Sequence, residues 1–132
     1  MRIRFLLLGV LAFFGLSSAL QAQDAVKADP AHYKVEVDNS QVRILRVHYG
    51  PHEKSPMHSH PATVAIFLTD ATGKFTFPDG KTQDINGKAG DVIYGAAVTH
   101  SPENTSDQPF DVIVVELKGK AAAAPAKKMQ TK

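Results

Sequence analysis

Short runs of β-branched and aromatic residues, each ended by a turn signal, fill the middle of this 132-residue chain. In residues 33–38, apolar and charged side chains alternate, which is the period of a half-buried strand. Residues 78–81, Pro-Asp-Gly-Lys, predict a hairpin turn, because Asp-Gly favours the backbone angles of a tight turn. Beyond residue 22, no run has a convincing helical period. The pattern predicts one all-β domain over residues 33–118, built as an antiparallel sandwich or small barrel.

Further turn signals divide this region. Residues 38–40, 71–73 and 86–87 are small or polar and are expected to turn the chain. Residues 58–70 are apolar on both faces in their middle and are therefore expected inside the sandwich or barrel.

The first 22 residues predict a secretory signal peptide. Two arginines precede an apolar core from Phe5 to Leu16, which is shorter than the roughly 20 residues that a membrane-spanning helix needs. Cleavage is expected after Ala22, with Ala19 as the alternative. The protein is therefore expected in the periplasm or outside the cell, with no membrane association once the signal has been removed.

The segments on either side of the predicted domain differ from it in composition. Residues 23–32 are small and polar, with one proline, and predict a flexible N-terminal segment. Residues 119–132 are rich in Ala and Lys and predict a disordered tail.

The chain contains no cysteine, so disulfides cannot stabilise the domain, and stability must come from a core, with help from a metal if one binds. Lys and Arg total 15 against 13 Asp and Glu, but two arginines lie in the predicted signal and four lysines in the predicted tail. The remaining body is acidic and has no basic cluster interleaved with aromatic residues. Nucleic acid is therefore not expected as a partner.

His58 and His60 stand at the start of the apolar run, on either side of Ser59. Alternate residues of a strand point to the same face, so the two imidazoles are expected together, as a pair of metal ligands. Two histidines do not complete a catalytic metal site, which usually takes three protein ligands and keeps one position open. A third ligand is therefore needed from elsewhere in the chain.

Two spaced sets of residues resemble the two motifs of the cupin family. In the first, glycines stand on either side of a His-x-His pair: Gly50, His58, His60 and Gly73. In the second, glycines precede a histidine and an asparagine: Gly90, Gly95, His100 and Asn104. The resemblance covers about residues 33–118 and implies a single antiparallel jelly-roll barrel. It also implies that His100 is the third metal ligand, as in the related three-histidine thiol and diketone dioxygenases.

The chain departs from the first motif at its glutamate, which falls on Val64. No carboxylate occurs between His60 and Asp70, so the family's usual site of three histidines and one glutamate is absent. Val64 is expected to form an apolar wall in place of an anionic ligand. Three neutral imidazoles suit Zn, Fe, Cu or Ni better than Mn. A divalent metal of that group is the expected cofactor, and a relic cluster that binds no metal is the alternative.

The other histidines are expected outside the cluster. His48 and His52 are expected on the surface or rim, where either could supply a fourth ligand, and His32 is expected to be solvated. Tyr94 could line the cavity or fill the core. No catalytic residue can be assigned, because no serine has the base and acid that would mark it as a nucleophile.

Two functions stay open from the sequence. The first is an exported small cupin-barrel protein of unassigned activity that binds a divalent metal or a small ligand in the barrel. The alternative is a metal-dependent oxygenase or isomerase that acts on a small polar substrate through the three-histidine site. Whether the chain is an enzyme is left open. A small molecule is the expected partner, and a homodimer formed through an exposed sheet edge is a further expectation.

Overall fold

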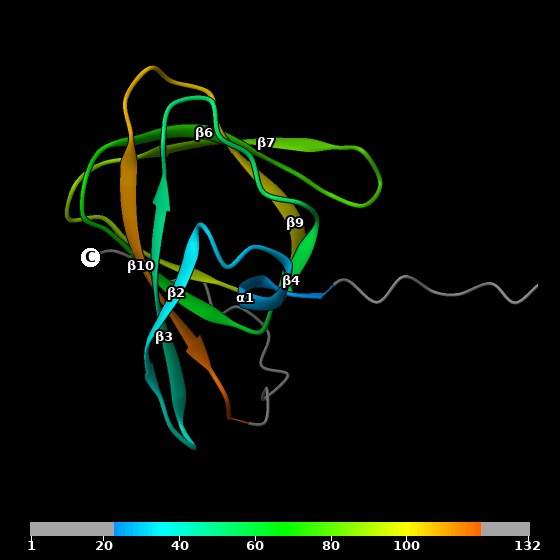
Figure 1. Cartoon of the computed structure of the whole chain (residues 1–132), viewed down its shortest axis with the longest axis vertical. Coiled ribbons are helices and arrows are strands. Elements are labelled where there is room, and N and C mark those ends of the chain that lie inside the picture. Colours follow the sequence, from blue (N-terminus) through cyan, green and yellow to red (C-terminus); the bar gives the residue numbers. More distant parts are fainter. Residues whose placement is uncertain (1–22, 120–132) are drawn as a thin grey trace, which may run out of the picture.

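The computed structural model describes residues 23–119, which form two five-stranded sheets around a common core (Figure 1). The strand orders are β1-β4-β9-β6-β7 and β2-β3-β10-β5-β8. Neighbouring strands are antiparallel, except for β1 and β4. The elements are β1 (Gln23–Asp24), α1 (Ala25–Ala28), β2 (Tyr33–Asp38), β3 (Val42–Tyr49), β4 (His58–His60), β5 (Thr63–Phe67), β6 (Ala71–Thr76), β7 (Thr82–Gly87), β8 (Val92–Gly95), β9 (Val98–Asn104) and β10 (Phe110–Leu117). The predicted all-β class is confirmed.

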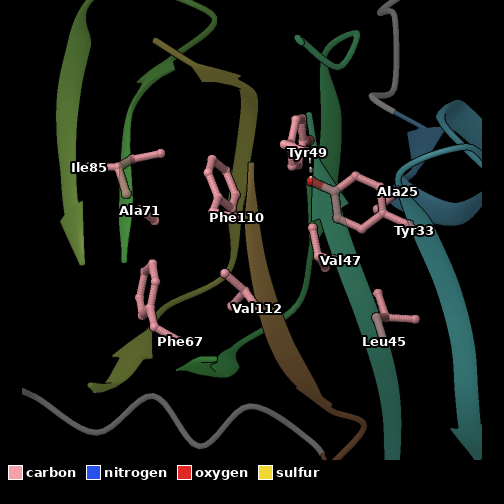
Figure 2. Packing of buried hydrophobic residues seen from close by; sticks show 10 residues of the cluster. All are labelled: Ala25, Tyr33, Leu45, Val47, Tyr49, Phe67, Ala71, Ile85, Phe110 and Val112. Atoms are coloured by element: carbon pink, nitrogen blue, oxygen red, sulfur yellow. Dashed lines mark hydrogen bonds between the residues drawn. The ribbon is translucent and has the colours of Figure 1, made fainter. Parts of the chain in front are cut away.

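Strand β10 lies at the centre of its sheet, between β3 and β5, and its alternation decides which side chains face the interior. Val112 and Val114 pair with Val47 and Leu45 of β3 on the inner face. The buried apolar cluster, drawn in Figure 2, consists of Ala25, Tyr33, Leu45, Val47, Tyr49, Phe67, Ala71, Ile85, Phe110 and Val112. Glu116 lies two positions beyond Val114 on the same face, so a carboxylate ends this apolar row.

The turn at residues 78–81 is found as predicted, between β6 and β7. The Phe77 amide donates a hydrogen bond to the Lys81 carbonyl at 2.9 Å. Gly80 has a φ of 81°, in the left-handed region that glycine adopts readily because it has no Cβ atom.

Residues 71–73 and 86–87 do not turn the chain, and this expectation is wrong. They lie within β6 and β7, which pair with each other along their whole length. Gly73 also pairs with Asn104 of β9, and a Cβ atom on Gly73 would lie 2.3 Å from the Glu103 carbonyl oxygen. The glycine is therefore needed for a close approach of two backbones, which a local sequence pattern cannot distinguish from a turn.

Residues 23–32, which the sequence predicts as a flexible segment, form β1, α1 and a turn against the barrel. Strand β1 pairs with β4, the strand that carries His58 and His60. The Asp24 carboxylate accepts a hydrogen bond from the Val26 amide at 3.1 Å and caps α1, and Ala25 is fully buried. This segment is held by contacts with strands that are distant in the sequence. Its local composition of small and polar residues does not predict those contacts.

The predicted signal peptide, residues 1–22, and the predicted tail beyond Gly119 lie outside the described residues. Between residues 23 and 119, no helix has the length and apolar character needed to span a membrane.

Candidate metal centre

His58, His60 and His100 come together inside the barrel. His58 and His60 lie on β4, and His100 lies directly opposite His58 on β9. One ligand atom from each of the three histidines lies within 4.8 Å of the others. The exposed fractions are 0% for His58 and 7% for each of the other two. The three residues predicted from the sequence thus form one buried cluster, and strand alternation explains why the first two share a face.

Hydrogen bonds determine which ring nitrogen is free in two of the three. His58 Nδ1 lies 2.9 Å from the Pro56 carbonyl oxygen, and His60 Nδ1 lies 2.7 Å from Glu116 Oε1. Carbonyl and carboxylate oxygens accept hydrogen bonds, so each Nδ1 donates. When the rings are neutral, the Nε2 atom of each ring therefore carries a free lone pair. The two Nε2 atoms are 3.1 Å apart, so their lone pairs converge on the space between the histidines. Lone pairs that converge in this way are the arrangement in which imidazoles bind a metal.

Burial keeps two of the rings neutral. It lowers the pKa of His58 to about 4 and that of His100 to about 3, with a further contribution from the neighbouring histidines. Neutral imidazole is the form that coordinates metals, so both rings are in the binding form at neutral pH.

His100 has two buried ring nitrogens, and neither has a hydrogen-bond partner within residues 23–119. Its ring packs on Phe75, with ring centroids 4.4 Å apart. A buried polar group without a partner is costly and rare in native proteins. Coordination of a metal by one nitrogen would give this ring the partner that the neighbouring side chains do not supply.

Glu116 is a site residue that sequence reasoning missed. It is 2% exposed, and its second oxygen accepts a hydrogen bond from Arg43 Nε at 2.6 Å. Burial alone would raise the pKa of this carboxyl, but the hydrogen bonds from His60 and Arg43 outweigh burial and lower it. Glu116 is therefore an anion directly behind His60. The inward parity of Val112, Val114 and Glu116 was a signal that could have identified it.

Val64 does not form the wall of the site, so the expectation for this residue is wrong. The β5 side chains that line the cavity are Thr63, Ala65 and Phe67, and Val64 lies between them with the opposite strand parity. Because strand parity has a period of two residues, an alignment error of one residue moves a side chain to the other face. In residues 23–119, no carboxylate joins the histidine group.

An apolar cavity of about 120 Å³ lies beside His60 and His100. The polar residues on its wall are Tyr33, Tyr49, His60, Thr63 and His100. A larger hollow of about 620 Å³, lined largely from β7, β8 and the segment that follows β8, shares His100 and Phe75 with it. Tyr94 lines this outer hollow and is 66% exposed, so it does not fill the core. The hollow therefore leads from the surface between β7 and β8 to the histidine cluster.

The other histidines lie away from the cluster. His48 and His52 are exposed, as expected, and bond to Asp111 and Asp107. Neither belongs to the group formed by His58, His60 and His100.

His32 is not solvated, in contrast to the expectation. Its side chain is 15% exposed and lies between Asp29, at 2.6 Å, and Glu53, at 2.9 Å. The ring also stacks on Tyr49, with centroids 4.4 Å apart. His32 therefore links the N-terminal segment to the loop before β4.

Comparison with known proteins agrees with this geometry. A family model described as a cupin domain matches residues 45–116, which is more than half of the chain and includes both β4 and β9.

Solved structures share the fold. A cupin domain from Bordetella pertussis Tohama I has a TM-score of 0.61 and 22% identity, over 66% of this chain and 92% of that one. An uncharacterised conserved protein with a double-stranded β-helix domain, from Klebsiella pneumoniae, has a TM-score of 0.55 and 21% identity, over 73% and 84% of the two chains. These similarities confirm the double-stranded β-helix, or jelly-roll, fold. The match to the cupin domain model over residues 45–116 shows that the chain belongs to the cupin family.

Proposed function

We propose that this protein is an exported cupin barrel that binds one divalent metal through the Nε2 atoms of His58 and His60 and a ring nitrogen of His100. The observation that carries the proposal is the convergence of two Nε2 atoms whose opposite nitrogens are committed as donors. The unpartnered ring nitrogens of His100 beside them support it.

The donor set selects among metals. Three neutral imidazoles favour Zn, Fe, Cu or Ni, whereas Mn binds better to carboxylate oxygen. Three protein ligands leave at least one position for an outside ligand, and a metal there would act as a Lewis acid on that ligand. The cavity beside His60 and His100 gives a small molecule room at this position.

A second candidate function is a metal-dependent oxygenase or isomerase that uses the same site. The hollow between β7 and β8 favours it, because a substrate would need such a path to reach His100. Apart from the histidines, the polar residues on the cavity wall are Tyr33, Tyr49 and Thr63. The hydroxyl groups of Tyr33 and Tyr49 hydrogen-bond to each other at 2.9 Å, so Thr63 is the residue of this set that we assign to a polar contact with a substrate.

Metal content tests the proposal. Protein isolated from its native compartment is expected to contain about one metal per chain by elemental analysis, and His100→Ala and His60→Ala are expected to lose it. His48→Ala is the matched control, since this exposed histidine lies outside the cluster. Equal metal content in the wild type and in a His58/His60/His100 triple alanine variant would contradict the proposal.

Export is tested separately. The mass of the intact protein in the periplasm or medium should correspond to a chain that begins at Gln23, or at Leu20 if cleavage follows Ala19. A full-length chain in the cytosol would contradict export and would leave the metal site unaffected.

A further inference from the structure

A line of charged side chains runs outward from the histidine cluster. His60 Nδ1 donates to Glu116 Oε1 at 2.7 Å, and Arg43 Nε donates to Glu116 Oε2 at 2.6 Å. Arg43 Nη2 in turn donates to Asp24 Oδ2. The four residues come from four different strands, β4, β10, β3 and β1. The line therefore joins the N-terminal segment to the proposed metal ligand.

Burial decreases along this line. The side chain of Glu116 is 2% exposed, that of Arg43 is 17% exposed and that of Asp24 is 30% exposed. The hydrogen bond to Glu116 is the main reason why the pKa of Arg43 is raised, so Arg43 stays cationic. Each charged side chain thus forms an ion pair with the next one toward the surface, and the line ends at the partly exposed Asp24.

The outermost residue is itself fixed at both of its oxygens. Asp24 Oδ1 accepts from the amides of Val26 and Lys27 at the start of α1, while Oδ2 accepts from Arg43. The two oxygens thus tie α1 to the charged line. Among the three clustered histidines, His60 is the one whose far nitrogen is held by a charged group, because His58 is held by a backbone carbonyl.

We propose that Glu116, Arg43 and Asp24 are positioning residues for His60, and that the N-terminal segment is thereby part of the metal centre. The proposal rests on the proposed function. A carboxylate on the far nitrogen of a metal-binding histidine fixes its tautomer and orientation and makes the other nitrogen a better ligand. Arg43 holds Glu116 in the required rotamer, and Asp24 holds Arg43.

The test is Co²⁺ binding to the full mature chain, followed by competition with a chelator and by the visible spectrum of the bound ion. Glu116→Gln keeps the size and one acceptor oxygen but removes the charge. It is expected to weaken Co²⁺ binding by about 10- to 100-fold and to change the spectrum. Asp24→Asn is expected to weaken binding less, and Asp24→Glu to restore most of the affinity. The matched control is Asp38→Asn, which removes an exposed ion pair with Lys118 and should change neither readout.

A double variant tests whether the residues act in series. Since Asp24 acts through Glu116, Asp24→Asn is expected to cause little further loss in a Glu116→Gln background. Full additivity would overturn the role of Asp24. If Glu116→Gln does not fold, Asp24→Asn and its rescue by Asp24→Glu decide the question, because Asp24 is partly exposed at the end of the line.

The outcomes separate this inference from the proposed function. Unchanged Co²⁺ affinity and spectrum in Glu116→Gln and Asp24→Asn, with a wild type that binds Co²⁺, would overturn the positioning role alone. A wild type that binds no Co²⁺ would overturn the metal site and this inference with it.

Discussion

The charge of the proposed site depends on which residues of β5 face inward. Thr63 and Ala65 line the cavity, and both are neutral, so a bound divalent metal would keep its full charge. The Glu116 carboxylate hydrogen-bonds to the cluster from behind His60 and forms an ion pair with Arg43. An inward carboxylate on β5 should therefore add the anionic ligand that this site lacks.

Ala65→Glu is expected to bring such a carboxylate into the cavity. Because Mn²⁺ prefers oxygen ligands, the variant should bind Mn²⁺ at least about tenfold more tightly than the wild type, or about 1.4 kcal/mol. The measurement is isothermal titration with Mn²⁺ and Zn²⁺.

Val64→Glu is the matched control, since it adds the same charge one residue away on the opposite face. It should leave the ratio of the Mn²⁺ and Zn²⁺ affinities unchanged. A larger change in Val64→Glu than in Ala65→Glu would show that position 64, and not position 65, faces the metal.

These residues also show how far the sequence could predict the site. Strand parity placed His58 and His60 together, and motif spacing added His100, so the three-histidine cluster was predictable. Val64 was misplaced because motif spacing alone does not give the register of β5 to within one residue. Glu116 was missed because its partners, His60 and Arg43, are separated from it by more than 50 residues of sequence.

At the scale of the strands, the pairing of β6 with β9 depends on a glycine. A Cβ atom on Gly73 would lie 2.3 Å from the Glu103 carbonyl oxygen of β9, and that atom belongs to the backbone, which cannot rotate away. Since β9 also carries His100, a displaced strand would affect both stability and the site.

Gly73→Ala is therefore expected to destabilise the fold by about 1–3 kcal/mol, the usual cost of overpacking. The measurement is urea unfolding. Gly119→Ala is the control, because a Cβ atom there would meet nothing within 4 Å. Equal unfolding midpoints for Gly73→Ala and the wild type would contradict this prediction. They would show that β6 and β9 can move apart to admit a Cβ atom without loss of stability.

The strands themselves were largely predictable, whereas the N-terminal segment was not. Alternation identified β2 at residues 33–38, and Asp79-Gly80 identified the turn between β6 and β7. Strand β1 and helix α1 are too short to have a period of their own. They form because β4, the Asp24 cap and Arg43 hold them, and these contacts depend on the complete barrel.

For the molecule as a whole, the buried ionisable groups determine how stability depends on pH. Burial lowers the pKa of His58 to about 4 and of His100 to about 3, against about 6.5 in an unfolded chain. The unfolded state therefore binds more protons than the folded state between these values. Stability should be highest above pH 6.5 and should fall as the pH decreases through this window.

The carboxylates act at lower pH. Hydrogen bonds lower the pKa of Asp24, Asp29 and Glu116 despite burial, which alone would raise it. Their contribution is fully present above the pKa of an unfolded carboxyl, about 4, and is lost as the pH falls further. Acid should thus destabilise the protein in two stages, the first caused by the histidines and the second by the carboxylates.

The first stage can be assigned by substitution. In the presence of a chelator, the free energy of unfolding of the wild type should fall by up to about 2.7 kcal/mol per pH unit between pH 6 and 5, because each of two histidines contributes up to about 1.36 kcal/mol per unit. His100→Leu removes one titrating group from its place beside Phe75 and should roughly halve this slope. Urea unfolding at several pH values measures this slope, with His52→Leu as the exposed control.

A wild-type free energy of unfolding that does not change between pH 6.5 and 5 would contradict this assignment. It would show that the buried rings are protonated as readily as those of the unfolded chain. With added Zn²⁺, the free energy of unfolding should fall more steeply as the pH decreases. Protons compete with the metal for the imidazoles, so the stability gained from Zn²⁺ binding is lost as the metal dissociates.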